Sequence, residues 1–159
     1  MKKILLLLLY FTLLATTAMF AGGKKEQAPA QKEYKIPEGT KPAGTVTFWH
    51  AMSGSRQKVI DNLVADFNAK NPGVTVEALY TGSYGETVTK GLAAVKAGNP
   101  PVLLMSYEVG TQTMKDSGAI IPVKNLNRGE VDFNDVVEPI MKYYSYDGEM
   151  YSFPFNSST

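Results

Sequence analysis

The feature that most constrains this chain is an alternation of strand-like and helix-like segments between residues 45 and 105. Residues 45–49 alternate polar and apolar side chains, and residues 74–80 are rich in β-forming residues. Both patterns predict strands. Residues 102–105 are apolar without alternation, which is typical of a central parallel strand covered by helices on both faces. Connections long enough to hold a helix imply parallel strands and right-handed crossovers. We therefore expect an α/β fold.

The two segments between these strands carry helix signals. In the first, apolar residues recur at helical spacing over residues 59–67, serines within residues 53–55 offer N-cap side chains, and Pro72 ends the pattern. In the second, Ser83 and Glu86 have the spacing of a capping box, which stabilises the first turn of a helix by about 1 kcal/mol.

The pattern weakens after residue 108. Asp147 and Gly148 suit a type I′ turn and predict a hairpin whose second strand covers residues 150–153. The other expected elements are a short helix over 111–117, an extended piece over 119–123, a surface loop over 125–132 and a helix over 133–144.

The first residues carry the pattern of an export signal. Lys2 and Lys3 precede an apolar run over residues 4–14, and small residues follow it. The run is shorter than the roughly 20 residues that a membrane span needs. We expect residues 1–23 to be a cleaved signal peptide and residues 24–43, which are poor in apolar side chains, to be a disordered linker.

Charge and composition narrow the classes of partner. The 159 residues carry a net charge of +1, and removal of the two signal-peptide lysines lowers it to −1. Such a balance creates no field that attracts nucleic acid or an anionic membrane, so we expect no nucleic-acid partner. We also expect the protein to be a monomer. The chain has no cysteine, which excludes disulfides and a lipid-modified N-terminal cysteine.

Polar and aromatic side chains follow each of the predicted strands. Trp49 and His50 end the first strand, residues 80–84 end the second, and residues 106–108 follow the third. Ligands bind at the carboxyl ends of the strands in open α/β sheets, because loops and helix N-termini converge there. The sequence therefore predicts a ligand-binding lobe, with Trp49, Tyr84 and Glu108 at a common rim.

Several ordered motifs connect these segments to a known family. They are TFWH at 47–50, FNAxNP at 67–72, YxGxY at 80–84, GNxP at 98–101, YEVGT at 107–111 and PFNSST at 154–159. With these motifs the chain resembles the family 1 extracellular solute-binding proteins of ABC importers. The resemblance covers nearly all of the sequence from residue 45 onward.

The resemblance implies a periplasmic-binding-protein-like lobe with a mainly parallel sheet flanked by helices. It would span residues 44–159 and stop at the crossover to a second lobe that this sequence does not contain. The implied function is periplasmic capture of sn-glycerol 3-phosphate, or a related glycerophosphodiester, for an ABC permease in the inner membrane, without enzymatic activity or a cofactor. Tyr84, Glu108 and Ser158 match ligand-contacting positions of the family, with Glu108 suited to a glycerol hydroxyl.

The residue types support a polar ligand. A carboxylate directly after a buried strand, as at Glu108, needs water, a partner or a ligand, because burying it alone costs several kcal/mol. A phenol in the first turn of a helix, as at Tyr84, can reach across a cleft, although it can equally be ordinary packing. The expected ligand contacts are Tyr84, Glu108, Ser158, Trp49, Ser157 and Asn156.

Other functions fit the residues less well. His50, Glu108 and Ser158 have the side chains of a hydrolytic triad, but Ser158 lacks the Gly-x-Ser-x-Gly elbow that exposes a nucleophile. A single histidine is more typical of a structural hydrogen-bonding group, and we expect no metal site. A dinucleotide fingerprint needs three glycines where this chain has Gly54 alone. An oligosaccharide stays open as the main alternative ligand, and the aromatic residues that could stack on it are Trp49, Tyr80, Tyr84 and Tyr107.

Overall fold

The computed structural model describes residue 37 and residues 39–156. The expected signal peptide, the expected linker up to residue 36, and Ser157 and Ser158 lie outside the described residues.

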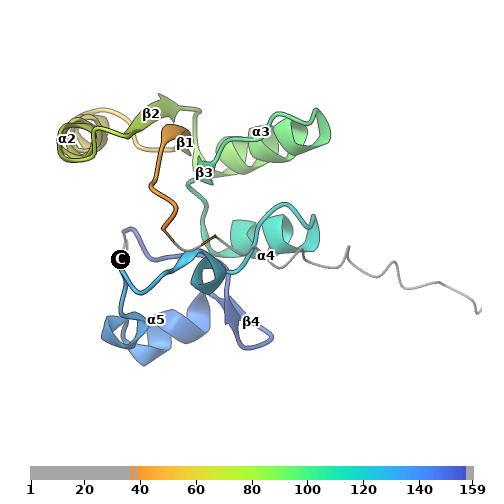
Figure 1. Cartoon of the computed structure of the whole chain (residues 1–159). Coiled ribbons are helices and arrows are strands. Elements are labelled where there is room, and N and C mark those ends of the chain that lie inside the picture. Colours follow the sequence, from red (N-terminus) through yellow and green to blue (C-terminus); the bar gives the residue numbers. More distant parts are fainter. Residues whose placement is uncertain (1–36, 38, 157–159) are drawn as a thin grey trace, which may run out of the picture.

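A parallel three-stranded sheet forms the first part of the fold (Figure 1). The strands are β1 (Gly44–His50), β2 (Val74–Tyr80) and β3 (Leu103–Leu104), in the order β2-β1-β3. β1 pairs with β2 along its whole length, and both pairings of β1 are parallel. The α/β class and the parallel crossovers expected from the sequence are confirmed.

The expectation that residues 102–105 form a central strand is wrong within the described part of the chain. β1 is central, and β3 is a two-residue strand at the edge. The Val102 backbone N–H donates a hydrogen bond to the Thr47 side-chain hydroxyl at 3.0 Å and not to a carbonyl of the neighbouring strand. The ladder of backbone hydrogen bonds between the strands therefore ends here. Val102 and Leu103 are 63% and 49% exposed. The apolar residues 102–105 therefore form neither a long strand nor one that helices cover on both faces.

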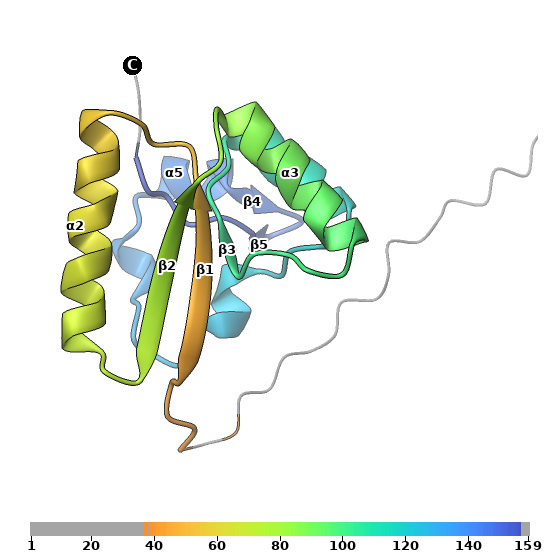
Figure 2. The same ribbon diagram turned by 90° about the horizontal axis from the view of Figure 1, so that it is seen from above.

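Helices flank the strand pair on opposite sides: α2 (Ser55–Lys70) lies beside one side and α3 (Tyr84–Lys96) beside the other (Figure 2). Successive strand residues point to opposite faces, so Phe48 and Trp49 meet different helices. Phe48 packs with residues of α2, whereas Trp49 faces the alanines of α3. The buried core on the α2 side consists of Met52, Ile60 and Met105.

The two long helices begin in different ways. The capping box of α3 is confirmed: the Glu86 amide donates to the Ser83 hydroxyl at 3.3 Å, and the Ser83 amide donates to the Glu86 carboxylate at 2.7 Å. The expected serine cap of α2 is wrong, because Gly54 is the N-cap residue and no side chain bonds the first turn. Its φ of 60° is in the left-handed region that glycine adopts without strain.

The apolar stripe of α2 is only partly covered. Ile60 is buried and Val64 packs beside it. The remaining stripe residues stay 44–55% exposed in the described structure; they are Val59, Leu63 and Phe67.

The segment after β3 differs in detail from expectation. α4 (Glu108–Asp116) begins at Glu108 rather than at Thr111. The 3-10 helix η1 (Val123–Leu126) follows, and no strand forms over residues 119–123.

The single helix expected over residues 133–144 is wrong. The segment splits into the 3-10 helix η2 (Phe133–Asp135) and the helix α5 (Glu138–Tyr143). Pro139 explains the break, because it has no N–H to donate to the carbonyl of Asp135 in a continuous helix.

The predicted type I′ hairpin is confirmed, with shorter strands than expected. β4 (Ser145–Tyr146) pairs with β5 (Glu149–Met150), and Asp147 and Gly148 have φ values of 53° and 81°. In Figure 1, α5 and this hairpin lie on one side of the molecule, the three-stranded sheet lies on the other, and α4 lies between them.

Candidate ligand-binding site

A cavity of about 350 Å³ lies where the N-termini of α3 and α4 meet α5. It brings together segments that are far apart in the sequence, as expected for the carboxyl side of a parallel sheet. The residues that line it are Tyr84, Ser106, Tyr107, Glu108, Pro139, Ile140, Tyr143, Tyr144 and Asn156.

Tyr84 has both a packing role and a polar one. Its ring packs against the core on the α2 side and lies 6.3 Å from the Tyr107 ring, centroid to centroid. Its phenol oxygen accepts a hydrogen bond from the Asn156 side-chain amide at 3.3 Å. The capping box at Ser83 fixes the start of α3, and so the place from which Tyr84 projects.

Glu108 is a solvent-accessible carboxylate at the edge of the cavity. It is the first residue of α4, where the positive end of the helix dipole favours a negative charge. Within the described part of the chain, its carboxylate has no hydrogen-bond or ion-pair partner. Glu108 and Tyr143 line the same cavity, and partial desolvation together with the Glu108 carboxylate raises the pKa of Tyr143. Glu108 is therefore free to accept hydrogen bonds from a ligand.

The lining is aromatic and acidic. It holds four tyrosines and one glutamate, and none of the lining residues is Lys or Arg. Hydroxyl groups and sugar-like rings fit such a surface, because phenols and a carboxylate bond hydroxyls while aromatic faces stack on apolar ring faces. A phosphate group finds no cation among these residues.

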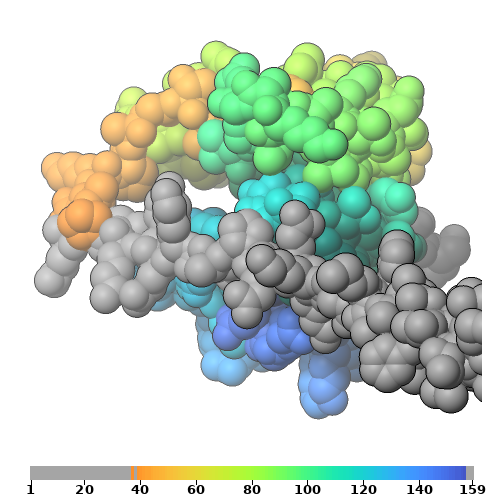
Figure 3. Space-filling model, turned by 90° about the vertical axis from the view of Figure 1, so that its right-hand side faces the viewer, coloured from red at the N-terminus to blue at the C-terminus, as the bar shows by residue number. Residues whose placement is uncertain are grey.

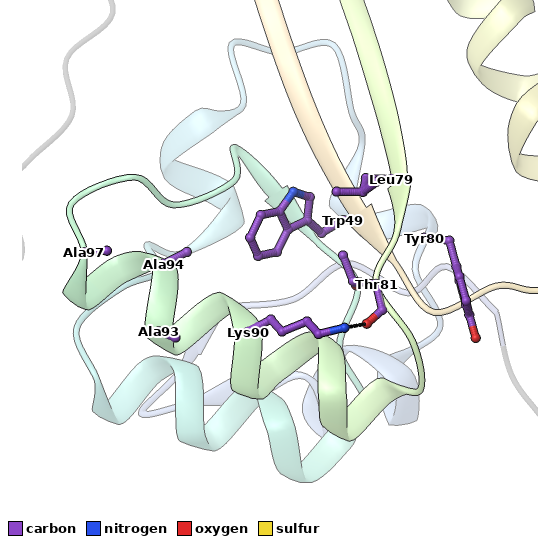
Figure 4. Close-up of a pocket in the computed structure, with 8 residues that line it drawn as sticks. All are labelled: Trp49, Leu79, Tyr80, Thr81, Lys90, Ala93, Ala94 and Ala97. Carbon is purple, nitrogen blue, oxygen red and sulfur yellow. Dashed lines mark hydrogen bonds between the residues drawn. The ribbon is translucent and has the colours of Figure 1, made fainter.

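Trp49 lies in a different place from the one expected. It lines a separate hollow of about 530 Å³ between the strands and α3, beside Ala93 and Ala94 (Figure 4). The Lys90 ammonium donates a hydrogen bond to the Thr81 carbonyl in the same hollow. The expected common rim is therefore confirmed for Tyr84 and Glu108 and wrong for Trp49, because the alternation of β1 turns Trp49 toward α3.

His50 is a structural residue rather than part of either hollow. It is 1% exposed, its Nδ1 accepts the Met52 amide proton at 3.3 Å, and its ring contacts Phe48 and Tyr80. Burial lowers the pKa of His50, although Asp61 opposes the shift. The described residues do not bring together the side chains of the possible hydrolytic triad, because His50 does not line the cavity that contains Glu108.

Six lining residues were not among the predicted ligand contacts: Ser106, Tyr107, Pro139, Ile140, Tyr143 and Tyr144. Tyr107 was considered only as a stacking residue for an oligosaccharide. The helical spacing that includes Ile140 and Tyr144 predicted packing, and Pro139 was the signal that a new helix starts here. Ser157 and Ser158 follow Asn156 outside the described residues, so their predicted contacts stay predictions.

Groups of metal ligands and membrane-spanning helices are both absent from the part of the chain that the structure describes. No group of histidine and acidic side chains there could hold a metal ion. Among the helices of residues 37 and 39–156, none has the length and apolar character to cross a bilayer.

Comparison with known proteins decides the family. The profile of the bacterial extracellular solute-binding proteins matches residues 62–159. The chain belongs to this family. The resemblance noted from the sequence motifs is confirmed.

A curated relative gives a closer likeness. The sn-glycerol-3-phosphate-binding periplasmic protein UgpB of Escherichia coli (strain K12) is 41% identical over 120 residues. The match covers 72% of this chain and 27% of UgpB, so the chain spans about a quarter of the relative's length.

Solved structures show the same fold. The mannotriose-bound CpMnBP1 matches with a TM-score of 0.61 and 28% identity over 69% of this chain and 28% of its own. UgpB from Mycobacterium tuberculosis, solved with glycerophosphocholine, matches with a TM-score of 0.66 and 22% identity over 72% of this chain and 30% of its own. The periplasmic-binding-protein-like fold class is thus confirmed.

Proposed function

We propose that this chain forms one wall of the ligand cleft in the substrate-binding component of an ABC importer, and that the ligand is sn-glycerol 3-phosphate or a related glycerophosphodiester. The observation that carries the proposal is the meeting of Tyr84, Glu108 and Asn156 in one cavity. The 41% identity to E. coli UgpB, which is named for sn-glycerol 3-phosphate, supports this ligand. The protein binds and releases its ligand without chemistry on it and without a cofactor.

Each polar side chain has a role set by its donors and acceptors. The ionised Glu108 carboxylate accepts hydrogen bonds from hydroxyls of the glycerol moiety. The Tyr84 phenol and the Asn156 amide, which bond each other in the free chain, turn to oxygen atoms of the ligand. Ser157 and Ser158 follow Asn156 in the sequence, and we assign them the role of hydroxyl donors to the ligand.

The phosphate end of the ligand lies away from this wall. None of the lining residues is cationic, and the Glu108 carboxylate repels a phosphate. We assign the glycerol end to this wall, and the balance of the phosphate charge to an opposing lobe that closes over the ligand by a hinge motion.

The remaining sequence fits an exported receptor. Residues 1–23 direct export to the periplasm, residues 24–43 form a tether, and residues 44–159 form the first lobe. The receptor acts as a monomer that delivers its ligand to a permease in the inner membrane, and it has no nucleic-acid partner.

An oligosaccharide is the second candidate ligand. The observation in its favour is the cluster of Tyr84, Tyr107, Tyr143 and Tyr144 around the cavity, because sugar rings stack on aromatic faces. The structural likeness to the mannotriose-bound CpMnBP1 supports the same candidate.

A chimeric receptor tests the two ligands against each other. This chain replaces the matching N-terminal segment of E. coli UgpB, and calorimetry measures binding of sn-glycerol 3-phosphate, glycerophosphocholine and mannotriose, with unmodified UgpB in parallel. We expect the chimera to bind the phosphoesters and not the sugar. Tight mannotriose binding without phosphoester binding would favour the oligosaccharide instead. We expect the 159-residue chain alone to bind weakly or not at all, since one wall does not exclude water.

A further inference from the structure

The YEVGT motif holds a buried hydroxyl that the cavity does not use. Thr111 is 2% exposed and does not line the cavity, although Tyr107 and Glu108 of the same motif do. Its hydroxyl oxygen lies 2.9 Å from the hydroxyl oxygen of Ser152, a residue 41 positions further along the chain. A buried polar contact over such a separation fixes two segments relative to each other.

The second contact of Thr111 favours Ser152 as the donor of this hydrogen bond. Its hydroxyl also donates to the Tyr107 carbonyl one turn earlier, at 3.4 Å. A threonine hydroxyl has a single proton, so when that proton goes to Tyr107 the oxygen accepts the proton of Ser152. Valine has nearly the same shape but neither donates nor accepts, and its substitution for Thr111 would leave Ser152 without this partner.

The helix that carries Thr111 is held on both sides. At its start, α4 lies so close to α3 that a Cβ at Gly110 would come within 2.9 Å of Val88 Cγ2. At its end, the Lys115 ammonium lies 3.2 Å from the Asp147 carboxylate and 5.8 Å from the ring centre of Tyr146. Figure 3 shows the green residues up to α3 above and the blue C-terminal residues below, with teal and cyan residues between them. α4 is thus a fixed support between the two parts of the fold.

The segment after the hairpin depends on side chains for its position. The hydrogen bond from the Tyr151 amide to the Tyr144 carbonyl, at 3.0 Å, is the last backbone bond of the described chain. Residues 152–156 form no helix or strand, and side-chain contacts hold them: Thr111 with Ser152, the Phe133 ring with the Phe153 ring at 6.0 Å between centroids, and Tyr84 with Asn156. The first of these contacts is buried at its Thr111 end, whereas Asn156 is exposed.

We propose that Thr111 is a positioning residue of the binding site: its hydroxyl anchors Ser152 on α4 and thereby sets where Asn156 meets Tyr84. The role in ligand binding rests on the proposed function, whereas the geometric claim does not. Thr111 acts through Ser152 and Asn156 and does not itself touch the ligand.

The geometric claim is tested by NMR on the isotope-labelled full chain, with the nuclear Overhauser effect between the Asn156 side-chain amide and the Tyr84 ring as the readout. We expect Thr111→Val and Ser152→Ala each to abolish this effect, and the double variant to change nothing further, because both remove the same bond. Thr111→Ser keeps the hydroxyl and should restore the effect. Thr113→Val is the matched control, since Thr113 lies on the same helix and its hydroxyl bonds, among the described residues, only the Val109 carbonyl.

The ring signals of the single histidine, His50, report whether each variant keeps its core. A folded Thr111→Val variant that retains the Tyr84–Asn156 effect overturns the proposal. If Thr111→Val unfolds the chain, Ser152→Ala becomes the deciding variant, because it removes the same hydrogen bond at Ser152, which is only half-buried. If both variants unfold, the contact serves general stability, and the proposal is overturned.

Affinity measurements in the UgpB chimera separate this inference from the proposed function. We expect Thr111→Val to weaken sn-glycerol 3-phosphate binding about fivefold, the effect of one net hydrogen bond, and Thr113→Val to leave it unchanged. If the parent chimera binds no phosphoester, the proposed function fails, and the NMR result still decides the geometric claim.

Discussion

The side-chain amide of Asn156 donates a hydrogen bond to the phenol oxygen of Tyr84 at 3.3 Å, across 72 positions of sequence. This contact joins the start of α3 to the segment that follows the hairpin, and Glu108 lines the same cavity. Three polar side chains from distant parts of the chain thus form one surface, which is the basis of the binding function proposed above.

The two long helices should respond differently to loss of a serine. Ser83→Ala removes the hydroxyl of the α3 capping box and should lower the free energy of unfolding by about 1 kcal/mol. Ser53→Ala is the matched control and should have almost no effect, because no side chain caps α2. Urea denaturation measures both variants, and equal losses would contradict the assignment of the caps.

Acidification should destabilise the fold through His50. Burial lowers the pKa of this side chain below its ordinary value of 6.5, so the folded state favours the neutral ring. The resulting stability is fully present above about pH 6.5 and is lost as the pH falls toward the lowered folded pKa, because the unfolded chain then binds more protons. Thermal denaturation between pH 7.5 and roughly 5.5 should show this loss.

Because the chain has one histidine, His50→Gln is a direct control. The variant is expected to lose most of the pH dependence in this range, whatever its overall stability. A wild-type histidine that titrates above 6.5 by NMR would show that burial does not dominate its environment.

Asn68 protects the outer edge of β2. Its side-chain amide donates to the Val76 carbonyl at 3.0 Å, and its side-chain oxygen accepts the Val76 amide proton at 2.7 Å. Asn68→Ala leaves both backbone groups without this partner and should cost about 1–3 kcal/mol. Asn62→Ala on the exposed face of the same helix should be nearly neutral. Similar denaturation midpoints for the two variants would show that water replaces the Asn68 contacts without cost.

Local signals in the sequence were sufficient for much of the fold. The alternation over residues 45–49, the Ser83–Glu86 spacing and the Asp147–Gly148 pair each act within a few residues, and the structure confirms all three predictions. The serine-rich start of α2 misled because a glycine with positive φ can begin a helix without a side-chain cap.

The candidate site was predictable only in part. Tyr84 and Glu108 follow strands and meet at the carboxyl side of the sheet, as the topology requires. Trp49 also ends a strand, but its direction depends on which helix covers which face, and that is a tertiary property. Tyr143 and Tyr144 line the cavity because α5 is a separate helix with Pro139 in its first turn. The helical spacing over residues 133–144 predicted one continuous helix and gave no sign of this break.

The central claim is that Glu108 binds the ligand, and its most direct test is calorimetry of sn-glycerol 3-phosphate with the UgpB chimera carrying Glu108→Gln. Glutamine keeps the size of the side chain but removes the charge that strengthens a hydrogen bond from a hydroxyl. We expect an affinity loss of at least about tenfold, and unchanged affinity for the control Glu77→Gln, which removes an exposed charge from β2. Equal affinities of the Glu108→Gln and Glu77→Gln chimeras would contradict the account.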